Sequence, residues 1–301
     1  MIDSISSANM LRGMLIGFLG IAMFSFTLPF TRYTIAFADP LLIAWGRSMV
    51  AGAAAGLCLL ALAQRKPTAQ EFKYLCLAIV GIVFGWPTLS SLSMKYAPAA
   101  HGAVINGLLP ISTAAVGALL ARKHLPASFW ALALLGAGLV AVYALWEGGG
   151  ALRAGDSVML LAVVCGGVGY AGGAKAATTL GGWQTICWAL VIAWPLSTAA
   201  TLIAYQSTPI AWDAVPAMAW WAFAYLALVS QLIGFFAWYA GLAIGGVPAV
   251  SQVQLLQIFL TVAASSALAL DPVPLRTWVF AVLIIGVLVA VRALGSKSQA
   301  N

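Results

Sequence analysis

Long apolar stretches recur along the chain, and short polar links separate them. Each stretch is about 20 residues long, which is the length that an α-helix needs to cross a hydrocarbon layer roughly 30 Å thick. The links carry charged or turn-forming residues, as in Gln64 to Thr68 and Asp271 to Pro274. The pattern predicts ten membrane-spanning helices, over residues 11–31, 41–63, 72–95, 99–121, 127–146, 156–178, 182–205, 217–242, 247–269 and 274–294.

The composition supports a membrane protein and excludes a soluble one. Of the 301 residues, 63% are hydrophobic and 7% are charged, against about 25% charged in an average soluble domain. Buried helices of a large soluble protein are the alternative, but outer helices would then need a charged face. The first apolar run follows Arg12 and is longer than the core of a signal peptide, so we expect it to stay in the membrane.

The basic residues predict how the chain is oriented. The side that holds the N-terminus has nine Lys and Arg and the other side has four, with Arg47 inside a helix completing the 14. Cytoplasmic loops are enriched in these residues, so we expect both termini to lie in the cytoplasm and the chain to span a bacterial inner membrane. The basic residues form no stripe, which argues against nucleic acid as a partner.

The residues that usually carry catalysis are scattered. The four cysteines and two histidines have no metal-ligand spacing, so we expect no metal, no cofactor and no enzymatic activity. No acidic residue falls in the middle of a predicted helix, which is where proton-driven pumps usually carry one. The seven acids lie in tails, links or helix ends and are Asp3, Asp39, Glu71, Glu147, Asp156, Asp213 and Asp271.

A weak internal repeat divides the chain into residues 1–149 and 150–301. Trp130 in the first half pairs with Trp278 in the second half at the same offset as the Ala- and Gly-rich segments that follow them. Each half holds five predicted helices, so the second half must enter the membrane upside down. That arrangement predicts a pseudo-two-fold axis in the membrane plane and a cavity between the halves.

A Pro-containing fourth helix is followed by a Gly-rich fifth helix, in an order that resembles the EamA-type drug/metabolite transporters. The segments that carry the resemblance are Ala103–Ile111, Trp130–Val142, Val250–Thr261 and Trp278–Val289. The resemblance implies an exporter of small metabolites that works by alternating access. Many family members have a Glu where this chain has Arg122-Lys123-His124, so no role of that acid is transferred.

The overall layout and the wealth of Trp and Tyr are similar to the YddG-like exporters of this superfamily. That closer resemblance implies aromatic and other amino acids as substrates. Export of other metabolites or of planar cationic drugs is an alternative, because neutral amides and aromatic rings fit all of these. An intramembrane enzyme and a structural membrane subunit are the alternatives from other classes. We expect a monomer whose partners are its small-molecule substrate and the lipid bilayer.

The ninth predicted helix carries the clearest polar stripe. Ser251, Gln254, Gln257, Thr261 and Ser265 are spaced by three or four residues and therefore share one helix face. Polar side chains in hydrocarbon usually face a bundle interior or a wet cavity. Carboxamides both donate and accept, which suits a zwitterion. The alternative is that these side chains only bond neighbouring helices.

Further candidates lie in other helices. Gln231 and Trp238 share a face of the eighth helix, and Trp86 lies deeper than an interfacial belt residue should. Asn106 precedes Pro110 by four residues, so its carbonyl loses its helical partner. Packing or simple kinks are the alternatives. The predicted substrate-binding residues are Trp86, Asn106, Tyr170, Gln231, Trp238, Ser251, Gln254 and Gln257, and the predicted helix-bending residues are Pro29, Pro87, Pro110 and Pro195.

Three predictions concern single residues whose surroundings the sequence does not define. Tyr170 lies among five glycines of the sixth helix, where either a neighbouring helix or the cavity comes close. Arg47 lies about seven residues into the second helix, so it can either bind a carboxylate or snorkel to the outer surface. His101 opens the fourth helix, where we expect it at the membrane interface.

Overall fold

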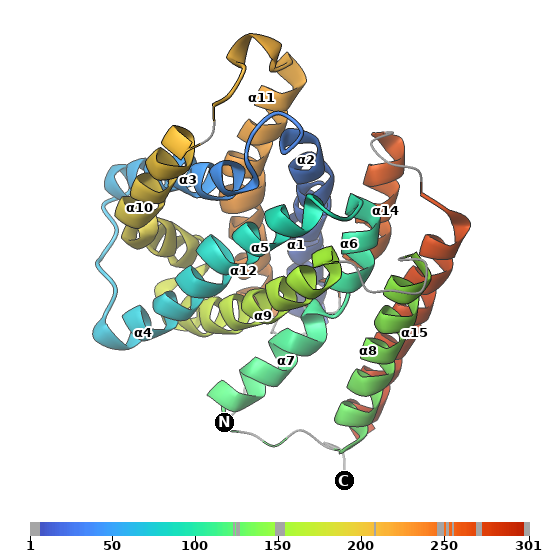
Figure 1. The fold of residues 1–301 in the computed structure, drawn as a ribbon. Helices are drawn as coiled ribbons and strands as arrows, with labels where there is room; N and C mark the ends of the chain where they lie inside the picture. The colour runs from blue at the N-terminus through green and yellow to red at the C-terminus, as the bar shows by residue number, and fades with distance from the viewer. Residues whose placement is uncertain are drawn as a thin grey trace.

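The computed structural model describes residues 7–122, 124, 127–147, 154–207, 209–245, 250, 253–254, 256–268 and 273–297, and all regular structure in them is helical (Figure 1). Seven stretches are long and apolar enough to cross a membrane. They are Ala8–Thr34, Pro40–Ala61, Ala69–Met94, Ala99–Leu120, Ala154–Leu180, Gly182–Ser207 and Ala217–Gly245. Helices α8 (Ala127–Glu147), α14 (Leu256–Ala267) and α15 (Leu275–Lys297) hold shorter apolar stretches. Each predicted span therefore contains a helix, and the predicted all-α fold is confirmed.

Several spans are built from more than one helical segment. In the first half, span 1 is α1 (Ser7–Ser25) and α2 (Thr27–Thr34), span 2 is α3 (Pro40–Ala61), span 3 is α4 (Ala69–Ala78), η1 (Ile79–Gly85) and α5 (Trp86–Met94), span 4 is α6 (Ala99–Asn106) and α7 (Leu109–Leu120), and span 5 is α8. In the second half, span 6 is α9 (Ala154–Leu180), span 7 is α10 (Gly182–Ser207), span 8 is α11 (Ala217–Ala224), η3 (Tyr225–Ile233) and α12 (Gly234–Gly245), and spans 9 and 10 are α14 and α15. The short 3₁₀ turn η2 (Trp212–Ala214) lies between spans 7 and 8.

Local sequence signals set where spans begin. Asp39 caps α3 by accepting a hydrogen bond of 2.8 Å from the Leu41 amide, and Pro40 supplies the first helical residue. Thr68 and Glu71 form a reciprocal capping box at the start of α4. Arg65 donates to Glu71 over 2.7 Å and joins the preceding link to this helix start; that hydrogen bond raises the pKa of Arg65. These caps fix the residues at which spans 2 and 3 begin.

Three of the four prolines predicted to bend helices lie just after an interruption. Pro29 lies in the first turn of α2, Pro87 is the second residue of α5, and Pro110 is the second residue of α7. A proline is tolerated at a helix start because the amide that it lacks has no helical partner there, as at Pro110. At Pro87 the helix is continuous instead, because α5 follows η1 directly and the Trp86 amide donates to the Gly81 carbonyl. Helix α10, in contrast, continues through Pro195.

Spans 3 and 8 each contain a π-helical segment, η1 and η3 respectively. The π-helix is rare and occurs frequently at functional sites. Span 3 is the third span of the first half and span 8 is the third span of the second half. The same uncommon geometry therefore occurs at the same place in both halves.

The helix packing obeys a two-fold exchange. Span 1 packs on span 8 and span 6 on span 3, while spans 2, 4 and 5 pack on spans 7, 9 and 10. Replacing each span by its counterpart five positions along turns the first pair into the second and returns the other three unchanged. Since each repeat has five spans, the second repeat is inverted relative to the first. The pairing of α8 with α15 is visible at one side of the bundle (Figure 1).

Glycines bring the equivalent crossings together. A Cβ on Gly81 of span 3 would lie 2.3 Å from the amide nitrogen of Gly169 in span 6. A Cβ on Gly13 of span 1 would lie 2.4 Å from Gly245 in span 8. Small residues at such positions let helix backbones approach closely in a membrane. The close-packing interpretation of the glycines in span 6 therefore holds at Gly169.

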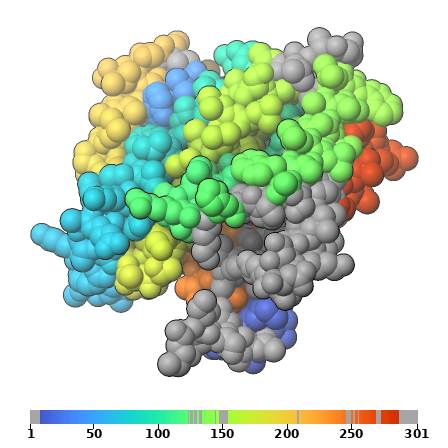
Figure 2. Space-filling view, turned by 90° about the horizontal axis from the view of Figure 1, so that it is seen from below, coloured from blue at the N-terminus to red at the C-terminus, as the bar shows by residue number. Residues whose placement is uncertain are grey.

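The close crossings join helices from opposite repeats, so the bundles are mixed. Spans 1, 8 and 9 form one bundle and spans 3, 4 and 6 form the other. On the face in Figure 2, α4 of the first repeat lies beside α10, and α8 lies beside α15 of the second repeat. The internal repeat predicted a cavity between the two halves of the chain. In the structure, it lies between the two mixed bundles.

Candidate functional site

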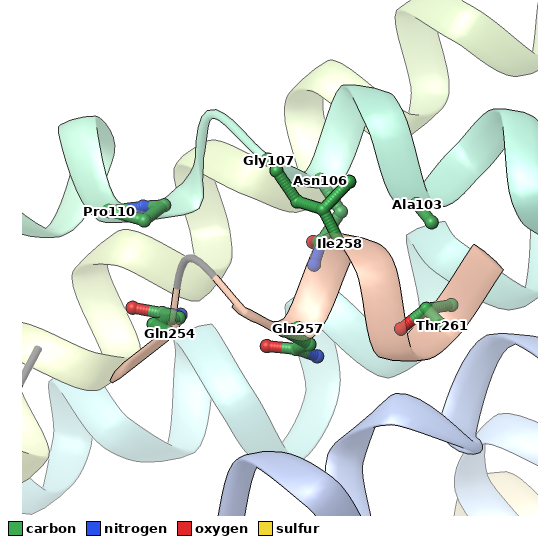
Figure 3. A pocket seen from close by; sticks show the side chains of 8 residues that line it. All are labelled: Ala103, Asn106, Gly107, Pro110, Gln254, Gln257, Ile258 and Thr261. Atoms are coloured by element: carbon green, nitrogen blue, oxygen red, sulfur yellow. The ribbon is translucent and has the colours of Figure 1, made fainter. Parts of the chain in front are cut away.

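A small central cavity of about 20 Å³, enough for about one water molecule, lies between the two mixed bundles. Its walls come from spans 1, 2, 3, 4, 6, 8 and 9, so both repeats contribute. A smaller cavity of about 10 Å³ adjoins it between span 4 and α14 (Figure 3). Asn106 and Gln257 line both cavities. We treat the two as one candidate site.

Arg47 lies at the wall of the central cavity and is 2% exposed. It is the eighth residue of α3, about 10 Å along the helix at 1.5 Å per residue. Its Nε donates to Oε1 of Gln231 over 2.9 Å, and Nη2 reaches the same oxygen. Its Cζ lies 5.9 Å from the centroid of the Trp86 ring. The side chain points inward, so the snorkelling alternative is excluded.

Gln231 holds Arg47 from the opposite repeat. Its side chain is fully buried, and its Nε2 donates to the carbonyl oxygen of Ile82 over 3.0 Å. Ile82 belongs to the π-helical segment η1 and Gln231 to η3, so this one side chain links the two segments. Its carboxamide oxygen then accepts from Arg47. Gln231 thus positions the guanidinium and does not itself line the cavity.

Trp86 and Asn106 form a second pair beside Arg47. The indole Nε1 of Trp86 donates to Oδ1 of Asn106 over 3.0 Å. Trp86 is the first residue after η1, and Asn106 is the last residue of α6. A Cβ on Gly166 would lie 2.9 Å from Cδ1 of Trp86, so this glycine leaves room for the indole. Both predicted residues line the cavity.

The other two aromatic candidates, Tyr170 and Trp238, pack against each other at tilted angles. Tyr170 lines the central cavity, and its ring centroid lies 5.9 Å from those of Phe235 and Trp238. Trp238 is buried behind Tyr170 and does not line the cavity. Tyr170 therefore has access to a bound molecule, whereas Trp238 supports it.

The polar stripe of span 9 is partly turned into the cavity. Gln254, Gln257 and Thr261 line the smaller cavity together with Pro110 (Figure 3). Both amide atoms of Gln254 and Oε1 of Gln257 are buried and have no hydrogen-bond partner. Buried amides usually have partners, so these atoms are ready to bind a polar molecule. Ser265 instead donates to a carbonyl of its own helix, and Ser251 lies outside the described residues.

The structure also brings together polar residues that the sequence did not single out. The hydroxyls of Thr27 and Ser230 lie 2.7 Å apart and line the central cavity. His101 is buried, and its Nε2 lies 2.6 Å from Oδ1 of the buried Asp156. His101, which we expect at the membrane interface, is the third residue of α6, and Asp156 from the first turn of α9 covers it. This pair lines neither part of the site.

A larger cavity of about 190 Å³ lies between α3, α10 and α11. Its lining is almost wholly apolar and includes Phe37, Trp212, Trp220 and Phe223. Such a lining offers no group for a charged molecule. Among the residues that the structure describes, no three His, Cys, Asp or Glu side chains gather where they could hold a metal ion.

Two inverted repeats of membrane-spanning helices around an internal polar cavity define a membrane transporter. The model of the EamA-like transporter family matches residues 11–145 and 153–292, so the chain belongs to that family. The chain is 39% identical over 282 residues to the uncharacterized transporter YdeK of Bacillus subtilis (strain 168), which covers 94% of this chain and 96% of that protein. A solved crystal structure with 20% sequence identity and a TM-score of 0.65 covers 96% of this chain and 99% of its own and shares the fold.

Proposed function

We propose that this EamA-family transporter exports small metabolites from the cytoplasm, with aromatic and other amino acids as its substrates. It works as a monomer in a bacterial inner membrane with both termini in the cytoplasm. The single observation that carries the proposal is the buried site that Arg47, Trp86, Asn106 and Gln257 line between the two mixed bundles. The YddG-like exporters that the sequence resembles suggest the same class of substrate.

The site offers one kind of group for each part of an aromatic amino acid. The rings of Trp86, Tyr170 and Phe235 form an aromatic wall for the side chain. Gln254 and Gln257 hold amide atoms without partners, which can accept from an ammonium group and donate to a carboxylate. Arg47 adds a cation for the carboxylate. An aromatic zwitterion therefore finds a partner for its ring and for both charges.

Alternating access follows from the two-fold arrangement. In span 4, α6 packs on α14 of the other bundle, whereas α7 packs on α9 of its own bundle. The interruption after Asn106 separates these two parts and lies at the site itself. Exchange of equivalent contacts between the two repeats would close one side of the site and open the other. The glycine crossings within each bundle would move as units.

We propose a facilitator or exchanger rather than a proton-driven pump. Among the described lining residues, none is a carboxylate, and Asp156 lies outside the site with His101. Proton-coupled transporters usually carry an acid along the substrate path. A substrate would then run down its own gradient or exchange for another.

Counterflow in liposomes tests the function. Liposomes that contain the purified protein are loaded with unlabelled amino acids and are given a panel of labelled amino acids outside, at equal pH on both sides of the membrane. We expect accumulation of labelled aromatic amino acids, and we expect Gln254→Ala and Trp86→Ala to reduce it. Strict dependence on a proton gradient would reject the facilitator and favour a role of the His101 and Asp156 pair. No movement of any amino acid would reject the substrate class.

A further inference from the structure

Arg47 is a buried cation, and no described residue around it supplies a negative charge. Its hydrogen-bond acceptor, Gln231, is a neutral amide. Of the described residues that line the site, none is acidic. Removing an ion from water costs several kcal/mol in a protein unless an opposite charge compensates it. The site therefore keeps a positive charge that a bound anion would stabilise.

The orientation of the guanidinium leaves one end available. Nε and Nη2 both donate to Gln231, whereas Nη1 is buried and has no partner. Arg47 lines the central cavity, so Nη1 is the guanidinium nitrogen left without a partner for a molecule bound there. A guanidinium prefers a carboxylate, since the bond is charge-assisted. Gln231 thus fixes Nε and Nη2 of Arg47 and leaves Nη1 available for a ligand.

The surroundings of Arg47 define what the carboxylate is attached to. The Trp86 ring lies 5.9 Å from Cζ, and Tyr170 and Phe235 line the same cavity. One aromatic ring beside the cation and two more in the same cavity suit an acid whose body is a flat ring. An uncharged aromatic molecule is not repelled by Arg47, but it gains no ion pair. An aromatic amine without a carboxylate brings a second positive charge next to Arg47. Such like charges disfavour each other strongly in a buried site.

We propose that Arg47 Nη1 is a carboxylate receptor and that the site selects aromatic monocarboxylates whether or not they carry an ammonium group. This inference deepens the proposed function and rests on it. Amino acids bind because of their carboxylate. Aromatic acids that lack the amine bind at least as well, because an ammonium finds only the neutral amides of Gln254 and Gln257 and no acidic residue in the described lining. Aromatic amines and planar cations are excluded.

A binding panel of three indoles separates these requirements. Indolepropionate carries only a carboxylate, tryptophan carries a carboxylate and an ammonium, and tryptamine carries only an ammonium. Isothermal titration calorimetry on the purified full-length protein at neutral pH measures each affinity. We expect indolepropionate to bind as tightly as tryptophan or more tightly, and tryptamine to show no binding. Tryptamine binding as tightly as indolepropionate would overturn the proposal, and this comparison needs no variant.

Substitution then assigns the effect to one residue. Charge-assisted hydrogen bonds contribute about 1.5–3 kcal/mol, so Arg47→Gln should weaken indolepropionate binding by roughly tenfold to a hundredfold. Arg47→Lys keeps the charge and should retain part of the affinity. Arg12→Gln makes the same charge change at an exposed position of α1 and should change nothing. Arg47→Gln protein that elutes as a folded species and binds indolepropionate normally would reject the receptor role.

The binding results and the transport results can fail separately. If liposomes move none of the three indoles while indolepropionate still binds through Arg47, the receptor stands and the proposed transport of amino acids falls. If tryptophan and tryptamine are both transported, and Arg47→Gln transports as the wild type does, the carboxylate receptor falls and the transport function stands.

Discussion

The third span of each repeat contains a π-helical segment, yet the two segments bring different side chains to the centre of the molecule. In the first repeat, η1 has the sequence IVGIVFG and is wholly apolar. In the second repeat, η3 has the sequence YLALVSQLI and carries Ser230 and Gln231. The two segments share a backbone geometry, but only the segment of the second repeat carries polar side chains to the centre.

Spans 2 and 7 differ in the same way. They pack on each other across the pseudo-two-fold arrangement, but α3 carries Arg47 whereas α10 has no charged residue in its whole length. A symmetric pair would place two like charges in one buried site, which is costly. The two repeats therefore share the arrangement of helices, while a charge in one repeat alone sets the ligand chemistry.

The largest effect should come from the two glycine crossings. We expect Gly81→Ala and Gly13→Ala each to lower the melting temperature of the purified protein, because the added Cβ would meet backbone atoms at 2.3 Å and 2.4 Å respectively. Such overpacking typically costs about 1–3 kcal/mol. Gly138→Ala is the control, since a Cβ there meets nothing within 4 Å. Loss of stability at only one crossing would show that the two are not equivalent.

The next largest effect should come from Gln231, the polar side chain that only the second repeat supplies. Gln231→Glu places a carboxylate against Arg47 without changing the size of the side chain, so it should compete with a bound carboxylate. We expect indolepropionate affinity to fall about tenfold or more while the protein stays folded. Gln70→Glu makes the same change at an exposed position of α4 and should leave calorimetric binding unaltered. Unchanged affinity in Gln231→Glu would mean that ligand and Gln231 do not share Arg47.

The smallest effect concerns the first repeat alone. Trp86→Phe keeps an aromatic ring and removes the hydrogen bond of 3.0 Å to Asn106. A neutral hydrogen bond contributes about 0.5–1.5 kcal/mol, so transport affinity should fall roughly twofold to tenfold. Trp146→Phe, at an exposed position of α8, serves as the matched control in the counterflow assay. Equal effects of the two substitutions would remove Trp86 from the site.

Much of the fold could be predicted from the sequence. The length of the apolar stretches predicted ten helical spans, and the repeat predicted their inverted relation. The spacing of Gln254 and Gln257 predicted that they face one cavity from a single helix; both do line the site, but α14 begins at Leu256 and Gln254 lies before it. These signals are local, because helix length and face depend on a few consecutive turns.

Contacts between distant segments could not be predicted. Gln231 bonds Ile82, which lies 149 residues away, and Asp156 meets His101 across 55 residues. A helical pattern places Arg47 on a face of α3, but which face turns inward depends on how α10 and η3 pack against it. The packing of spans from both repeats in each bundle also depends on distant contacts. The sequence pattern therefore predicted a cavity between the two halves of the chain and not between the mixed bundles.

A structure of the protein with bound bromotryptophan tests the central claim most directly. We expect a bromine peak among Trp86, Tyr170 and Phe235 and a carboxylate oxygen about 3 Å from Nη1 of Arg47. The ligand in the apolar cavity beside Trp220 and Phe223, or a carboxylate in the central cavity turned away from Arg47, would contradict it.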